Sequence, residues 1–283
     1  MKPDCKLSAA ITLVGVLATV SVVVNIQQNR KADQLQQAQP FILNSTQLIQ
    51  KGQYAEARSS LEKALEFLPE HATLHNNLGF ACQQEKDFTC AETHFRKAVE
   101  LVPQSWQFHK NLASLYHIQQ RYTESQVEYL KTLDIAPDEE KPAIIADFGR
   151  LLNQTGNYLE AFNRSQAALM RGQSPEVRSA LLNNIAWADW KLGRRKLAEI
   201  ALRQSIQQQA TVDNLCLLSE IQATHTQATS NKTTRQSLKQ CQAKVQSELA
   251  QNPTLLEFKP EVREWSQSKQ SGNQTKFELL SQE

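Results

Sequence analysis

Glycine and proline are both scarce in this chain, at 8 and 9 of its 283 residues, so long series of tight turns are not expected. Positive and negative charges nearly balance, and the formal net charge is only +2. A protein that holds a polyanion needs clustered basic residues, and no arginine or lysine stripe interleaved with aromatics is present. The composition therefore favours a helical chain and argues against nucleic acid as a partner.

Signatures of catalysis and of cofactor binding are missing as well. The sequence has no glycine-rich phosphate loop, no HExxH pair and no nucleophile elbow. None of the 5 cysteines stands in a CxxC motif, and no histidine completes a zinc-finger spacing. His71 and His75 are four residues apart, but His71 follows Pro69 and Glu70 and is expected in a turn. Two solvated histidines are the better interpretation, and we expect no enzyme activity, no cofactor and no metal.

One long apolar run stands near the N-terminus. Residues 7–26 carry no charge, and at ~1.5 Å per residue a helix of this length spans the hydrocarbon core of a bilayer. The run is longer than the ~7–15 residues of a signal-peptide core, and no A-x-A cleavage site follows it. We expect an uncleaved transmembrane anchor, with a cleaved signal peptide and a buried soluble helix as the alternatives. The short tail with Lys2 and Lys6 favours a cytoplasmic N-terminus and a periplasmic or otherwise extracytoplasmic remainder.

Residues 72–105 have the pattern of two antiparallel helices. Small or apolar residues gather on one face of each helix, at Leu78, Gly79 and Cys82 and then at Ala91, Phe95 and Ala98. Lys86 and Asp87 are expected at the turn between them, and Pro103 after the second helix. Gly79 and Ala91 allow close approach of the two backbones, and Phe95 is expected to fill the space beside them. One such pair cannot bury its own apolar faces, so further copies are required.

The copies are present, at spacings of 34 residues that lengthen to 36 and 37 near the end. Three positions hold small residues in every copy. They are Ser45, Gly79, Ala113, Gly149 and Ala186 in the first helix, then Ala57, Ala91, Ser125, Ala161 and Ala198, and Ala64, Ala98, Thr132, Ala168 and Ser205, in the second. Proline follows the second helix at Pro69, Pro103 and Pro137.

This pattern resembles the tetratricopeptide repeat family over residues 38–212, and the segments GQYAEARSSLEKALEFLP and LNNIAWADWKLGRRKLAEIALRQSI are similar to its members almost throughout. The resemblance implies an all-α fold, a right-handed helix–turn–helix solenoid of about five repeats with C-terminal capping helices, preceded by one transmembrane helix. The expected segments are a tail at 1–6, the anchor at 7–26, a polar stalk at 27–37, the repeats at 38–212, capping helices at 213–252 and a mostly disordered tail at 253–283. Pro40 is expected at a helix start, where proline is tolerated.

In this family the first helices line a concave groove that binds extended peptides. Carried over to this sequence, the resemblance implies partner-binding positions in repeats two to five. They are Asn77, Phe80, Lys110, Asn111, Asp147, Arg150, Asn184 and Trp187, with Asn76, Gln84, Ser114, His117, Gln154, Asn183, Trp190 and Lys191 beside them. Amides can bind a peptide backbone of any sequence, although asparagines there can instead bond along the stack. Trp187 and Trp190 can anchor a partner or fill the joint with the capping helix.

The cysteines beyond the apolar run form two symmetric pairs. Cys82 and Cys90 are equidistant from the turn of repeat two, and Cys216 and Cys241 from the loop between the capping helices. Equidistant residues of antiparallel helices are neighbours, so both pairs are possible disulfides in an oxidising compartment. The alternative is four reduced, buried thiols.

These features predict a membrane-anchored scaffold that binds a protein or peptide partner in its groove. The rival hypothesis is a structural subunit of a membrane or envelope assembly that docks through its convex face and terminal helices.

Overall fold

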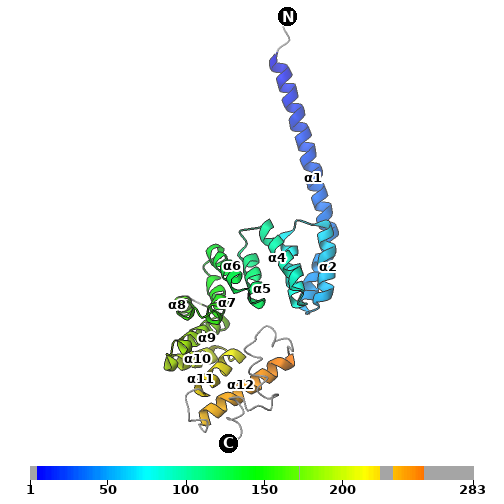
Figure 1. Cartoon of the computed structure of the whole chain (residues 1–283). Helices are drawn as coiled ribbons and strands as arrows, with labels where there is room; N and C mark the ends of the chain where they lie inside the picture. The colour runs from blue at the N-terminus through cyan, green and yellow to red at the C-terminus, as the bar shows by residue number, and fades with distance from the viewer. Residues whose placement is uncertain (1–4, 172, 224–231, 252–283) are drawn as a thin grey trace. The chain divides into compact units, whose positions relative to one another are not determined.

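The structure is a computed structural model, and it describes residues 5–171, 173–223 and 232–251, with side chains at 25–171, 173–222, 236–248 and 250. Every regular element in this part of the chain is an α-helix, in agreement with the predicted all-α class. Figure 1 shows them in chain order and labels all of these helices except α3. They are α1 (Cys5–Gln50), α2 (Tyr54–Phe67), α3 (Ala72–Gln84), α4 (Phe88–Leu101), α5 (Trp106–Ile118), α6 (Tyr122–Ile135), α7 (Lys141–Gln154), α8 (Tyr158–Leu169), α9 (Pro175–Lys191), α10 (Arg195–Gln208), α11 (Val212–Ala223) and α12 (Lys232–Gln251).

The chain forms two compact units, residues 1–115 and residues 116–283. In the first unit α1 packs on α2, α2 on α3, and α3 on α4. In the second unit α6 packs on α7, and consecutive helices are in contact from α7 to α12. Each contact of this kind joins helices that are adjacent in sequence, as expected of stacked helix pairs.

The small positions predicted from the repeat are buried. The residues of the second helices at the first such position, Ala57, Ala91, Ser125, Ala161 and Ala198, are all 0% exposed. A β-carbon added to Gly79 would lie 2.7 Å from Cδ1 of Phe95, and Phe95 is itself 0% exposed. The prediction that Phe95 packs against Gly79 is therefore confirmed, because only glycine leaves room for the ring at that point.

The turn between α3 and α4 follows from local chemistry. Lys86 has a positive φ of 65°, which reverses the chain after α3. Asp87 then caps α4, since its Oδ1 accepts a hydrogen bond of 3.1 Å from the amide of Cys90. This backbone hydrogen bond, together with Arg58, holds the pKa of Asp87 below its ordinary value.

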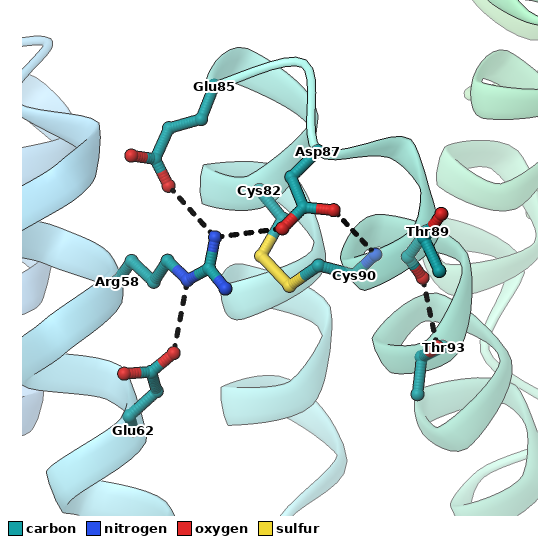
Figure 2. Close-up of polar contacts among 8 residues, drawn as sticks. All are labelled: Arg58, Glu62, Cys82, Glu85, Asp87, Thr89, Cys90 and Thr93. Carbon is teal, nitrogen blue, oxygen red and sulfur yellow. Dashed lines mark hydrogen bonds and ion pairs between the residues drawn. A yellow bond between two sulfur atoms is a disulfide. The ribbon is translucent and has the colours of Figure 1, made fainter.

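Arg58 joins the first repeat to this turn, as Figure 2 shows. Its Nη1 lies 3.0 Å from Oδ2 of Asp87 and 3.5 Å from Oε2 of Glu85, while its Nε donates to Glu62. Beside this cluster Cys82 and Cys90 form a disulfide that ties α3 to α4, with their Cα atoms 5.8 Å apart. The second unit holds the corresponding bond between α11 and α12, where the Cα atoms of Cys216 and Cys241 are 4.7 Å apart.

Two predictions about the first unit are wrong. Pro40 does not begin a helix but lies inside α1, where Pro40 and Gln36 are exposed, so water can bond the carbonyl that proline leaves without a donor. His75 is not solvated but buried, with Nε2 2.9 Å from the carbonyl of Pro69 and Nδ1 3.0 Å from Nδ1 of His94. His71, in contrast, stands before α3 as predicted, where its ring accepts from the amide of Leu74.

The predicted anchor, residues 7–26, falls in the part of α1 where no side chain before residue 25 is described. Within the described residues no helix combines the length and apolarity that crossing a bilayer requires. The predicted tail at 253–283 lies outside the described residues.

Candidate functional site

The first unit holds four of the predicted binding residues, on α3 and α5. Asn77, Phe80, Lys110 and Asn111 are all half-buried. Nδ2 of Asn111 donates a 2.8 Å hydrogen bond to Oδ1 of Asn76, one repeat earlier. The ring of Phe80 packs edge-on against Tyr54 at 5.9 Å between centroids. Part of the predicted amide row in this unit therefore bonds along the stack.

The second unit brings Arg150, Asn184 and Trp187 together around one cavity of about 480 Å³, which we call the α7–α9 cavity. It lies on the face formed by the first helices of repeats four and five. Its lining residues are Gln120, Tyr122, Arg150, Asn153, Gln154, Tyr158, Asn183, Asn184, Trp187, Trp190, Lys191, Asp213 and Glu220. Asp147, the remaining predicted residue, lines a smaller hollow of about 190 Å³ that shares Arg150, Asn183, Asn184 and Asp213 with the cavity.

The side chain of Asn184 is hydrogen-bonded within the helix stack. Its side chain is 6% exposed, and Nδ2 donates a 2.8 Å hydrogen bond to the carbonyl of Ala146. A second hydrogen bond joins the same helices, since Nδ2 of Asn153 donates to the carbonyl of Asn184 at 3.0 Å. These two bonds fix α7 against α9 and set the shape of the cavity wall.

Three buried polar atoms in the wall have no hydrogen-bond partner among the described residues. They are Oδ1 of Asn153, Oδ1 of Asn183 and Nε1 of Trp187. Asn153 is only 5% exposed. A buried acceptor or donor without a partner costs about 1–3 kcal/mol, so such atoms are rare in folded proteins. These two acceptors and one donor belong to residues that line the cavity.

Two aromatic rings and a cation also line this cavity. Trp187 and Trp190 meet edge to face, with centroids 5.8 Å apart. Nζ of Lys191 lies 4.2 Å from the ring centre of Trp190 and 5.5 Å from that of Trp187, although the lysine is exposed. The rings pack against the core that α9 shares with α10 and α11, which is the second of the two uses considered for the tryptophans, and they also line the cavity.

The charge of Arg150 contributes to the shifted pKa of a neighbouring histidine. Burial and, to a lesser extent, the nearby charge of Arg150 lower the pKa of His117 to about 4, although a hydrogen bond with Gln154 and the charge of Asp147 oppose the shift. No ion pair of Arg150 is found among the described residues. The guanidinium therefore stands at the junction of the two hollows as an available cation.

Several lining residues were missed by sequence reasoning. Tyr122 and Tyr158 begin α6 and α8, and the matching positions of α2 and α4 are Tyr54 and Phe88. An aromatic at the start of four second helices is a recurrence that could have been noticed. Asp213 and Glu220 come from α11, and nothing in the repeat pattern indicates that a capping helix contributes to this cavity.

The described residues contain no group of three histidine, cysteine or carboxylate side chains placed to hold a metal. A family model described as a TPR repeat matches residues 47–86, and one described as a tetratricopeptide repeat matches residues 83–140. Residues 47–140 are therefore similar to tetratricopeptide repeats. A comparison with functionally curated proteins finds no match.

Solved structures extend the likeness of fold over most of the chain. PilF of Pseudomonas aeruginosa is 17% identical, with a TM-score of 0.59, over 82% of this chain and 99% of that one. PilW, a widely conserved type IV pilus biogenesis factor, is 17% identical, with a TM-score of 0.58, over 80% and 98% of the two chains. YrrB, a TPR protein with an unusual peptide-binding site, is 19% identical, with a TM-score of 0.50, over 66% and 91%. At these identities the likeness shows the fold alone.

Proposed function

We propose that this tetratricopeptide-repeat chain is a membrane-anchored scaffold that binds a segment of a partner protein in the groove of its first helices. The observation that carries the proposal is the α7–α9 cavity, whose wall holds buried polar atoms without partners. Oδ1 of Asn183 needs a donor and Nε1 of Trp187 needs an acceptor. In an extended peptide the N–H and C=O of one residue point to the same side, so one bound segment can satisfy both atoms.

The geometry changes which residues are expected to bind the partner. Asn111 and Asn184 donate within the stack, so they position the groove. Asn183, Trp187 and Arg150 are the residues that we expect to touch the partner segment. The peptide-binding site of YrrB, a protein of similar fold, supports a function of this kind.

Affinity capture with the full chain in mild detergent tests the proposal. The groove variant carries Asn183→Ala and Arg150→Ala. The matched control carries Asn163→Ala and Arg203→Ala, because both of these residues are exposed on second helices and lie outside the cavity. Proteins retained by the wild-type chain and the control but lost from the groove variant are the expected partners. Equal retention of every captured protein by the groove variant would contradict the proposal.

The membrane anchor rests on the uncharged run at residues 7–26. In the proposed topology the N-terminus is cytoplasmic and the repeats lie on the far side, where an oxidising compartment permits both disulfides. Protease added to intact spheroplasts should degrade the repeats. Repeats that survive this treatment would reverse the orientation, and a mature N-terminus beyond residue 26 would replace the anchor with a cleaved signal peptide.

Exposed apolar residues on second helices favour a second candidate function, docking of the outer face into a membrane or envelope assembly. Val127 on α6, Leu159 on α8 and Ile200 on α10 are 47%, 59% and 53% exposed. Replacing these three by serine should release an assembly partner if the outer face docks. The same change should leave the groove partner in place, so the two functions separate.

A further inference from the structure

The lining of the α7–α9 cavity also indicates which kind of side chain the cavity suits. Four aromatic rings line it, from Tyr122, Tyr158, Trp187 and Trp190. Aromatic faces attract cations, and they do so most strongly for indole. The two indoles already hold a cation, the ammonium of Lys191, at 4.2 and 5.5 Å from their ring centres.

Lys191 is a replaceable occupant of this aromatic site. Its side chain is exposed, and among the described residues it makes no ion pair. A lysine stem is long and flexible, so the ammonium can move into water at little cost when another cation arrives. Arg150, the other cation of the wall, borders the smaller hollow as well and therefore stands at the junction, while Trp190 and Glu220 line only the larger cavity.

The unpartnered atoms select among cations. Oδ1 of Asn153 and Oδ1 of Asn183 are acceptors, and a guanidinium offers five N–H donors in one plane. That plane can stack on an indole while its edge bonds the amide oxygens, which an ammonium cannot do. The carboxylate of Glu220 adds a negative charge to the same wall. Nε1 of Trp187 donates and suits the backbone carbonyl of a bound residue.

We propose that the α7–α9 cavity is a pocket for an arginine side chain of the partner segment, and that Lys191 covers its tryptophans until the segment binds. The inference rests on the proposed function and deepens it. The partner is then a protein with an exposed, extended stretch that contains an arginine.

The probes are peptides of the form acetyl-Ala-Ala-X-Ala-Ala-amide, titrated by calorimetry into the full chain in non-ionic detergent. X is arginine, citrulline, glutamate or phenylalanine. Citrulline has the shape of arginine without its charge, so the pair isolates the cation. The arginine peptide should bind about ten-fold tighter than the citrulline peptide, the size of effect expected of a partly desolvated cation–π contact.

Variants of the chain test the role of each wall group. Lys191→Gln removes the competing ammonium and should tighten the arginine peptide by about two- to five-fold. Lys196→Gln, which removes an exposed lysine of α10 outside the cavity, should leave the affinity unchanged. Trp190→Leu should abolish the preference for arginine over citrulline. Because Trp190 also packs against the core, Glu220→Gln gives a second variant, which should lessen that preference while its melting temperature checks the fold.

Each outcome is informative. Tighter binding of the phenylalanine or glutamate peptide, absence of binding by any peptide at millimolar concentration, or weaker binding in Lys191→Gln would each overturn the arginine pocket. If the groove variant still loses its partner in affinity capture while arginine is not preferred, the scaffold function stands and only the arginine inference fails. If arginine is preferred but the groove variant keeps every partner, the proposed function fails instead.

Discussion

Gly79 and Phe95 offer a test of the repeat packing. The effect of Gly79→Ala on the free energy of unfolding should change sign when the ring of Phe95 is removed. An added β-carbon at Gly79 would lie 2.7, 2.9 and 3.0 Å from three ring atoms of Phe95. Overpacking of this kind costs about 1–3 kcal/mol, since Phe95 is 0% exposed and has no free space to enter. Replacing glycine by alanine inside a helix otherwise stabilises it by about 1 kcal/mol. Gly79→Ala should therefore lower the free energy of unfolding by up to about 2 kcal/mol in the wild-type background.

The result should invert when the ring is removed. Phe95→Ala alone should cost about 3–5 kcal/mol, because it deletes a fully buried ring. In that background Gly79→Ala meets no clash, so the helix gains and stability should rise by about 1 kcal/mol. The coupling between the two positions should then be about 1–3 kcal/mol.

Urea denaturation followed by circular dichroism measures all four members of the cycle. Gly52→Ala is the matched control, since Gly52 has a φ of +71° and nothing within 4 Å of an added β-carbon. Its cost comes from backbone strain and should be the same with and without Phe95. A coupling below about 0.5 kcal/mol between positions 79 and 95 would refute the assigned packing.

Replacing Cys216 and Cys241 by alanine should destabilise the chain by about 3 kcal/mol, given their separation of 25 residues. Four free thiols at Cys82, Cys90, Cys216 and Cys241 in native protein would exclude both disulfides. The pKa of His117 is lowered to about 4, chiefly by burial, so as the pH falls this histidine is protonated in the unfolded chain before it is protonated in the folded one. The stability that the neutral, buried His117 contributes is therefore present above about pH 6.5 and lost as the pH falls towards 4. His117→Gln should flatten that slope, and an NMR titration midpoint above 6 would contradict it. Asn184→Ala should cost about 1–3 kcal/mol by leaving the carbonyl of Ala146 without a donor, whereas the exposed Asn163→Ala should change the melting temperature little.

The helix pairs were predictable because the small residues of the repeat mark the points where two helix backbones approach closely. Gly79 and Ala91 leave room between the two helices, and Phe95 fills it beside Gly79. Pro40 was misjudged because a proline signals a helix start only where the preceding carbonyls must stay bonded within the protein. At the exposed part of α1 water can take that role.

The direction of polar side chains was harder to predict than the position of apolar ones. Asn183 and Asn184 are neighbours in sequence, yet Asn184 bonds α7 while Oδ1 of Asn183 is left without a partner in the cavity wall. Only the position of α7 relative to α9 decides this. Similarly, the burial of His75 depends on His94, a residue of the next helix that no periodicity marks as its neighbour.

The continuity of α1 has a mechanical consequence. One helix runs from Cys5 to Gln50 and packs on α2 at its end, so the polar stretch at 27–37 is a rigid spacer whose twist is passed to the first repeat (Figure 1). One residue inserted there would turn the repeat by about 100° around the helix axis and raise it by about 1.5 Å. Seven inserted residues make almost two whole turns, so they would raise it by about 10 Å with little rotation. The length of this spacer thus sets both the distance of the first repeat along the axis of α1 and its rotation around that axis.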